Sequence, residues 1–145
     1  MVPLCADQAV AEVERRGGAS AIAISLPHYY SGMLEWSRAL GGVPVLLHAA
    51  DRAWVLRSDP AVEQWDGETY ALPGGLTLLR LGGHFEGGTV LYWPGGADGR
   101  GALLSGDIVQ VLPHRRSVTF MWSYPNMLPT AVARGRADRD RKSVV

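Results

Sequence analysis

Two histidines and one aspartate stand at the ends of short apolar segments of this sequence. His28 comes soon after the run 21–24, His84 lies inside the glycine-rich segment 82–88, and Asp107 follows another apolar run. Imidazole and carboxylate groups are ligands of borderline and hard divalent cations such as Zn²⁺. Since α/β proteins bind ligands beyond the carboxyl ends of their strands, the three side chains predict a metal site there.

Each of these residues also has an ordinary structural explanation. A histidine in a loop can be exposed or simply hydrogen-bonded, and Asp107 after Gly106 can bond its own backbone in a turn. The combination favours a site over three unrelated loop residues. His48 also ends a strand-like run and is interpreted as structural, while His114, next to two arginines, is interpreted as a polar loop residue.

Helical and extended patterns alternate in the first half of the chain, before the second candidate ligand. The expected elements are a helix over 8–16 begun by Asp7, a strand over 21–24, a loop over 25–30, a helix begun by Ser31 and ended by Gly41, a strand over 43–47 and a helix over 49–56. Buried strands alternating with helices predict an α/β fold.

From residue 68 the pattern changes to short strands separated by glycine-rich turns. The expected strands are 69–72, 76–81, 89–93, 102–105, 108–112 and 118–122. We therefore expect a mixed α/β (α+β) architecture, in which helices cover one face of the sheet and a second face needs its own cover.

Composition excludes several classes of protein. The 145 residues contain a single cysteine, Cys5, which leaves no internal disulfide framework and no multi-cysteine zinc site. No apolar run approaches the roughly 18 residues of a membrane span, and the first seven residues lack a signal-peptide pattern. We expect a cytoplasmic protein without a membrane partner.

Basic residues gather near the C-terminus although the 14 Lys and Arg balance the 14 Asp and Glu. Segment 134–142 holds five of the basic and two of the acidic residues, which leaves nine against twelve in the remainder of the chain. An acidic body does not attract nucleic acid, so nucleic-acid binding is not expected. Residues 134–145 are expected to form a charged, disordered tail, and contact of that tail with nucleic acid or an acidic partner stays a weaker alternative.

The chain resembles the metallo-β-lactamase superfamily over about residues 3 to 130. The Gly-His-x-x-Gly turn of that superfamily matches 83–87, and its bridging aspartate after an apolar strand matches Asp107. Its motif His-x-His-x-Asp-His falls on Leu26, His28, Tyr30 and Ser31. The resemblance implies part of an αββα sandwich over residues 1–133, incomplete at both ends.

Departures from the superfamily motif imply a reduced metal site. Leu26 stands where the first histidine belongs, and Tyr30 and Ser31 replace the Asp-His pair of the second metal. The remaining ligands His28, His84 and Asp107 imply one zinc ion or none, with a fourth position left for water.

The resemblance implies a metal-dependent hydrolase in which zinc would acidify a bound water. Glu86 could orient that water as a general base, or be a solvated turn carboxylate; Tyr29 could stabilise an oxyanion, or simply pack at the rim. The small-molecule substrate stays open among β-lactams, thioesters, lactones and phosphoesters.

The alternative function is a non-catalytic remnant of the fold that serves as a binding or oligomerising module. Because the superfamily's N-terminal strands have no counterpart here, an apolar face or a strand edge should be exposed, and we expect the chain to form a homo-oligomer.

Overall fold

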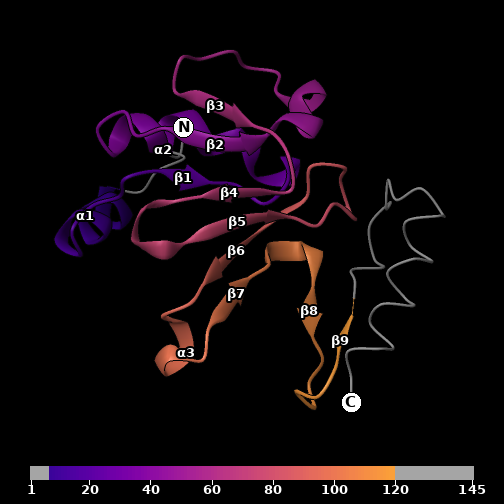
Figure 1. Cartoon of the computed structure of the whole chain (residues 1–145). Coiled ribbons are helices and arrows are strands. Elements are labelled where there is room, and N and C mark those ends of the chain that lie inside the picture. Colours follow the sequence, from indigo (N-terminus) through magenta and orange to yellow (C-terminus); the bar gives the residue numbers. More distant parts are fainter. Residues whose placement is uncertain (1–6, 120–145) are drawn as a thin grey trace.

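The computed structural model describes residues 7–119, which form two main sheets and a separate hairpin (Figure 1). The first sheet is parallel and contains β1 (Ile22–Ala23), β2 (Val45–His48) and β3 (Val62–Trp65), with β2 in the middle. The second sheet is antiparallel and contains β4 (Thr69–Ala71), β5 (Thr77–Arg80), β6 (Thr89–Trp93) and β7 (Ala102–Leu104) in chain order. The hairpin pairs β8 (Gln110–Val111) with β9 (Val118–Thr119).

Helical segments are short and lie mostly between the strands. They are α1 (Asp7–Arg15), η1 (Pro27–Gly32), α2 (Met33–Ala39), η2 (Ala49–Trp54), η3 (Pro73–Gly75), α3 (Gly96–Gly99) and η4 (Gly106–Ile108), where η marks a 3₁₀ helix. Two of them follow strands of the first sheet: η2 begins directly after β2, and η1 begins after residues 24–26, which follow β1. The polypeptide beyond these strand ends is therefore fixed in short helical turns.

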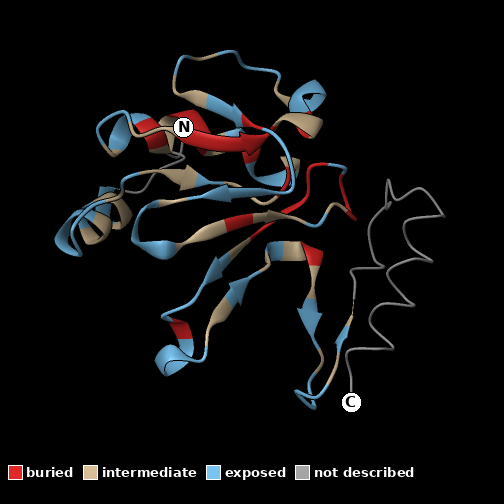
Figure 2. Cartoon of the chain, in the orientation of Figure 1, coloured by how far each residue is buried: buried red, intermediate tan, exposed pale blue. Residues whose placement is uncertain are grey.

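Strand β2 forms the centre of the core, and all four of its residues are buried (Figure 2). Val45 and Leu47 pack against residues of η1 and α2, while Leu46 packs against Trp65 and against Leu78 of β5. Side chains of a strand alternate between its two faces, so β2 contacts helices on one side and the second sheet on the other. The layers are thus helix, sheet, sheet.

A further apolar cluster closes the end of the two sheets where the candidate residues lie. It contains Leu26, Phe85, Val90 and Ile108, which come from the end of β1, the β5–β6 loop, β6 and η4. This cluster brings together the three chain segments that carry His28, His84 and Asp107.

The expected α/β class is confirmed, and strand 89–93 has the expected bounds. Segment 25–30 was expected as a loop but includes the start of η1, because Pro27 at its first turn has a backbone angle suited to a helix. Ser31 does not cap α2, which follows Gly32 without a side-chain cap. Strand β3 was not predicted, since its exposed Glu63 and Gln64 interrupt the apolar pattern.

Some expectations fall on residues that the structure does not describe. These are Cys5, the end of the last expected strand, the boundary of the domain at 133 and the tail 134–145. Among residues 7–119, no helix combines the length with the apolar composition that a membrane span requires.

Replacing Gly87 tests how tightly the β5–β6 loop packs against η2. A Cβ on Gly87 would lie 2.7 Å from Cγ of Asp51, so Gly87→Ala should lower the free energy of unfolding by about 1–3 kcal/mol. Gly32→Ala is the control, because its Cβ would meet its nearest neighbour, Cδ1 of Trp36, at 3.7 Å and should cost less than about 1 kcal/mol. Denaturant unfolding measures the free energy of unfolding of both variants. If Gly87→Ala loses no more stability than Gly32→Ala, the β5–β6 loop can shift away from η2 at little cost.

Candidate functional site

The rings of His28 and His84 lie edge to face, with their centroids 4.9 Å apart. His28 is exposed on η1, whereas His84 is 4% exposed in the β5–β6 loop. The ring of Phe85 contacts both, at centroid distances of 5.1 Å and 5.0 Å. The structure therefore brings the two predicted imidazoles together on an apolar base.

Backbone pairing fixes the segment before His28 to the second sheet. The amide of Thr89 donates a hydrogen bond to the carbonyl of Ser25 at 2.9 Å. The next residue, Leu26, is 1% exposed and packs in the cluster with Phe85. The position of the first superfamily histidine is therefore part of the apolar core that supports the imidazole pair.

Asp107 lies on η4 and is bound by the residue after His28. The hydroxyl of Tyr29 donates a hydrogen bond to Oδ2 of Asp107 at 2.7 Å. This hydrogen bond, together with desolvation and the charge of Asp107, raises the pKa of the Tyr29 phenol. Tyr29 thus stays protonated at neutral pH, and it holds one carboxylate oxygen of Asp107 beside the histidine segment.

The second-metal positions of the superfamily motif carry no ligand. Tyr30 is buried against Met33 and Leu34, and burial together with the charge of Asp51 raises the pKa of its phenol far above neutral pH. Ser31 is exposed. A buried neutral phenol is no metal ligand, so nothing at these two positions supports a second ion.

Glu86 lies at the surface of the loop that carries His84. Its side chain is 77% exposed and forms an ion pair with Arg80 at 3.7 Å. The general-base role of Glu86 stays a prediction, and the placement matches the alternative of a solvated turn carboxylate.

The two other histidines have local roles, as expected. Nδ1 of buried His48 accepts a hydrogen bond from the Ala50 amide at 3.1 Å, so its Nε2 carries the proton and donates to the Gly67 carbonyl at 3.0 Å. Nδ1 of exposed His114 accepts from the Arg116 amide at 3.1 Å. His114 lies in an exposed turn, as predicted, and the hydrogen bonds of His48 agree with its structural interpretation.

Asp51 is the residue of this region that the sequence analysis missed. Its carboxylate lies on η2, is 2% exposed, and accepts a hydrogen bond from the Gly87 amide at 2.7 Å. Burial raises the pKa of Asp51, and the Gly87 hydrogen bond opposes that rise. The signal available was a single acid within segment 49–54, which does not by itself identify a buried contact.

The side chains of His28, His84 and Asp107 are suitable ligands for one metal ion, but they do not surround a common position that an ion could occupy. Within residues 7–119, no three His, Cys, Asp or Glu side chains lie close enough together to hold a metal ion. His28 and His84 are adjacent, and Asp107 is linked to the same segment through Tyr29. Two imidazoles and a carboxylate form a donor set for a single borderline cation, with Asp107 having to move toward the histidines.

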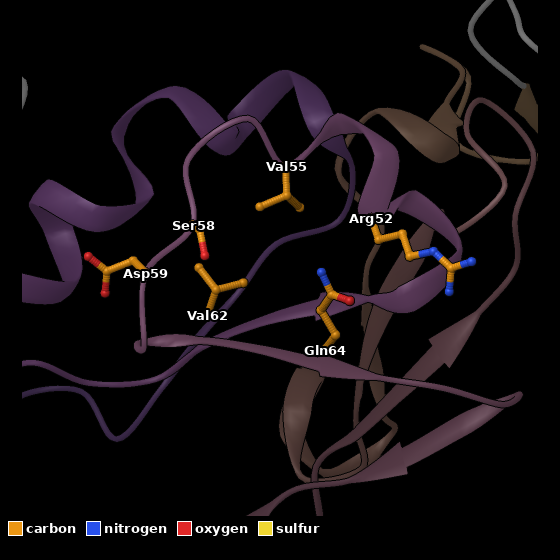
Figure 3. Close-up of a pocket in the computed structure, with 6 residues that line it drawn as sticks. All are labelled: Arg52, Val55, Ser58, Asp59, Val62 and Gln64. Carbon is orange, nitrogen blue, oxygen red and sulfur yellow. The ribbon is translucent and has the colours of Figure 1, made fainter.

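A groove of about 580 Å³ opens beside the candidate site. His28 and Tyr29 are part of its lining, together with apolar residues of β1 and α2 such as Ile22, Met33 and Trp36. Another pocket, of about 210 Å³, lies between η2 and β3 and is lined by none of the predicted site residues (Figure 3). The larger groove is thus the one that reaches His28.

Solved structures with the same arrangement of elements are enzymes and metal-bound proteins. TTHA1623 in a di-iron-bound form matches with a TM-score of 0.63 and 26% identity over 92% of this chain and 70% of that one. An N-acyl homoserine lactone hydrolase, with its product bound at the catalytic metal center, matches with a TM-score of 0.58 and 18% identity over 91% and 58% of the two chains. The metallo-β-lactamase SMB-1 matches with a TM-score of 0.54 and 17% identity over 93% and 57%.

The chain has the metallo-β-lactamase fold. No model of a protein family matches it. It is 48% identical over 118 residues to the uncharacterized protein YmaE of Bacillus subtilis (strain 168), which covers 81% of this chain and 43% of YmaE. The chain therefore spans less than half the length of that relative and about three fifths of the hydrolase.

Within the metallo-β-lactamase fold, position 26 can be tested directly. Leu26→His should raise zinc affinity, because it adds an imidazole in the cluster that contains Phe85, whose ring also contacts the ring of His28. It should also lower stability by roughly 1.5–3 kcal/mol, because Leu26 is buried.

Leu26→Ala is the matched control, because it loses the same apolar contacts without adding a ligand. Calorimetric zinc titration and thermal melts of both variants separate the two effects. If Leu26→His binds zinc no better than the parent chain while remaining folded, position 26 does not face the ion.

Proposed function

We propose that the chain is a metal-dependent hydrolase of the metallo-β-lactamase type with a mononuclear site formed by His28, His84 and Asp107. The observation that carries the proposal is the contact of the His28 and His84 rings, whose centroids are 4.9 Å apart, in a fold shared with a hydrolase that has a catalytic metal center and with a di-iron-bound protein. Zinc is the proposed ion, although the di-iron form of TTHA1623 makes iron an alternative.

Each of the predicted site residues would have a separate role in such a metal site. A bound ion would supply Lewis acidity and an activated water. His84, buried on the loop, and His28, at the surface, would hold the ion between core and solvent. Tyr29 would orient Asp107 through Oδ2 and leave the other oxygen for the ion. The groove that reaches His28 and Tyr29 would admit a small substrate whose non-reacting part is uncharged, since its lining contains no Asp, Glu, Lys or Arg.

A non-catalytic binding module is the second candidate. It is favoured by the burial of Leu26 at a ligand position and by the absence of a gathered three-ligand group within residues 7–119. The two candidates differ in whether the chain retains a metal after purification.

Metal content decides between them. Protein purified without chelator should hold at most one zinc per chain by elemental analysis, and His28→Ala or His84→Ala should weaken binding by about 100-fold or more, since losing a supporting group alone costs roughly 10–100-fold. His114→Ala is the control and should bind like the parent chain. Two ions per chain would contradict the mononuclear site, and none after zinc addition would favour the binding module.

We also propose that the chain forms a homodimer. Tyr92 and Leu103 lie opposite each other on β6 and β7, and both side chains are exposed on the same face of the sheet. Contiguous exposed apolar surface on a sheet commonly marks an association site. The second copy is proposed as its cover.

Light scattering tests the dimer. Leu103→Lys should shift the chain toward the monomer, because it places a charge in the apolar patch, whereas Leu56→Lys, at an exposed position outside the sheets, should leave the mass unchanged. A clean monomer of the parent chain at high concentration would overturn this proposal.

A further inference from the structure

The loop that carries His84 is closed by hydrogen bonds of its own backbone. The carbonyl of Gly88 accepts from the amides of Leu81 and Gly82, both at 2.9 Å, and the amide of Gly88 donates to the Phe85 carbonyl at 3.1 Å. The hydroxyl of Thr89 donates to the Gly87 carbonyl at 2.8 Å. These bonds define the shape of the loop but not its distance from the first sheet.

The Asp51 carboxylate connects this loop to the first sheet. It follows β2 on η2, while Gly87 belongs to the connection between β5 and β6 of the second sheet. Its Oδ1 accepts the Gly87 amide at 2.7 Å, and a buried carboxylate without such a partner would be costly. The bond therefore couples the two sheets beside the histidines.

Gly87 packs so closely against Asp51 and His48 that no side chain fits at this position. A Cβ there would lie 2.7 Å from Cγ and 2.8 Å from Oδ2 of Asp51, and 3.0 Å from Cβ of His48. Gly87 is not among the residues with positive φ, so space and not backbone angle requires glycine. The loop consequently has little freedom to move toward η2, and the hydrogen bond opposes movement away from it.

We infer that Asp51 is a positioning residue of the site, which holds Gly87 and thereby fixes His84 against His28. His84 is three positions before Gly87 in the same loop, and its ring is buried against Phe85. Because backbone hydrogen bonds hold this loop in one shape, a displacement of Gly87 should also displace the imidazole of His84. This inference rests on the proposed function for its metal, but the anchoring of the loop can be measured without one.

Two substitutions of Asp51 test the inference in the full chain. Asp51→Ala removes the acceptor, and Asp51→Asn keeps an acceptor oxygen of nearly the same shape. Without metal, the Gly87 amide of Asp51→Ala should exchange with solvent at least about 10-fold faster relative to the Leu47 amide of β2. With zinc, Asp51→Ala should bind about 10–100-fold more weakly than the parent chain, and Asp51→Asn should restore both properties.

Leu78→Ala is the matched control for general destabilisation. Leu78 is buried in the cluster between the sheets, so its loss should speed exchange of both amides alike and leave zinc affinity of the folded protein unchanged. If Asp51→Ala does not fold, Gly87→Ala keeps the carboxylate while displacing the loop, and it should weaken zinc binding in the same way.

The outcomes separate this inference from the proposed function. A parent chain that binds no zinc overturns the metal site, whereas selective loss of Gly87 protection in Asp51→Ala would still support the anchoring role. A parent chain that binds zinc, with Asp51→Ala binding equally well and protecting Gly87 equally, overturns the positioning role of Asp51.

Discussion

The hydrogen bond between the Asp51 carboxylate and the Gly87 amide joins the two sheets at the edge where the candidate site lies. It is 2.7 Å long and buried, and burial makes such a bond costly to break without a replacement. The absence of a side chain at Gly87 is a condition for it. Placement of His84, contact of its ring with His28 and closure of the apolar cluster below them all depend on where this loop is held.

Apolar packing sets the other boundary of the site. Leu26 and Phe85 pack in one apolar cluster, and the ring of Phe85 contacts both imidazoles as well as the ring of Trp54, which it meets edge to face at a centroid distance of 5.5 Å. The same packing places a leucine where the superfamily motif has a histidine. Under the proposed function, this chain would combine an apolar support for a metal site with a reduced set of ligands, in which Asp107 and its partner Tyr29 would complete the histidine pair.

Much of the fold could be predicted from the sequence because its signals are local. The apolar run of β2 and the glycine-bounded β6 are determined by short-range patterning, and the loop with His84 was expected where it occurs. Strand β3 was missed because half of its residues face solvent at a sheet edge. The role of Asp51 could not be predicted, since it depends on contact with a residue 36 positions later in the chain.

A crystal of the chain soaked in zinc, with anomalous scattering recorded at the zinc edge, tests the central claim most directly. The account predicts one peak per chain, with nitrogen atoms of His28 and His84 and an oxygen of Asp107 at about 2.0–2.2 Å from the ion, and with the bond from Gly87 to Asp51 retained. A peak bound by other residues, or no peak beside these histidines at saturating zinc, would contradict it.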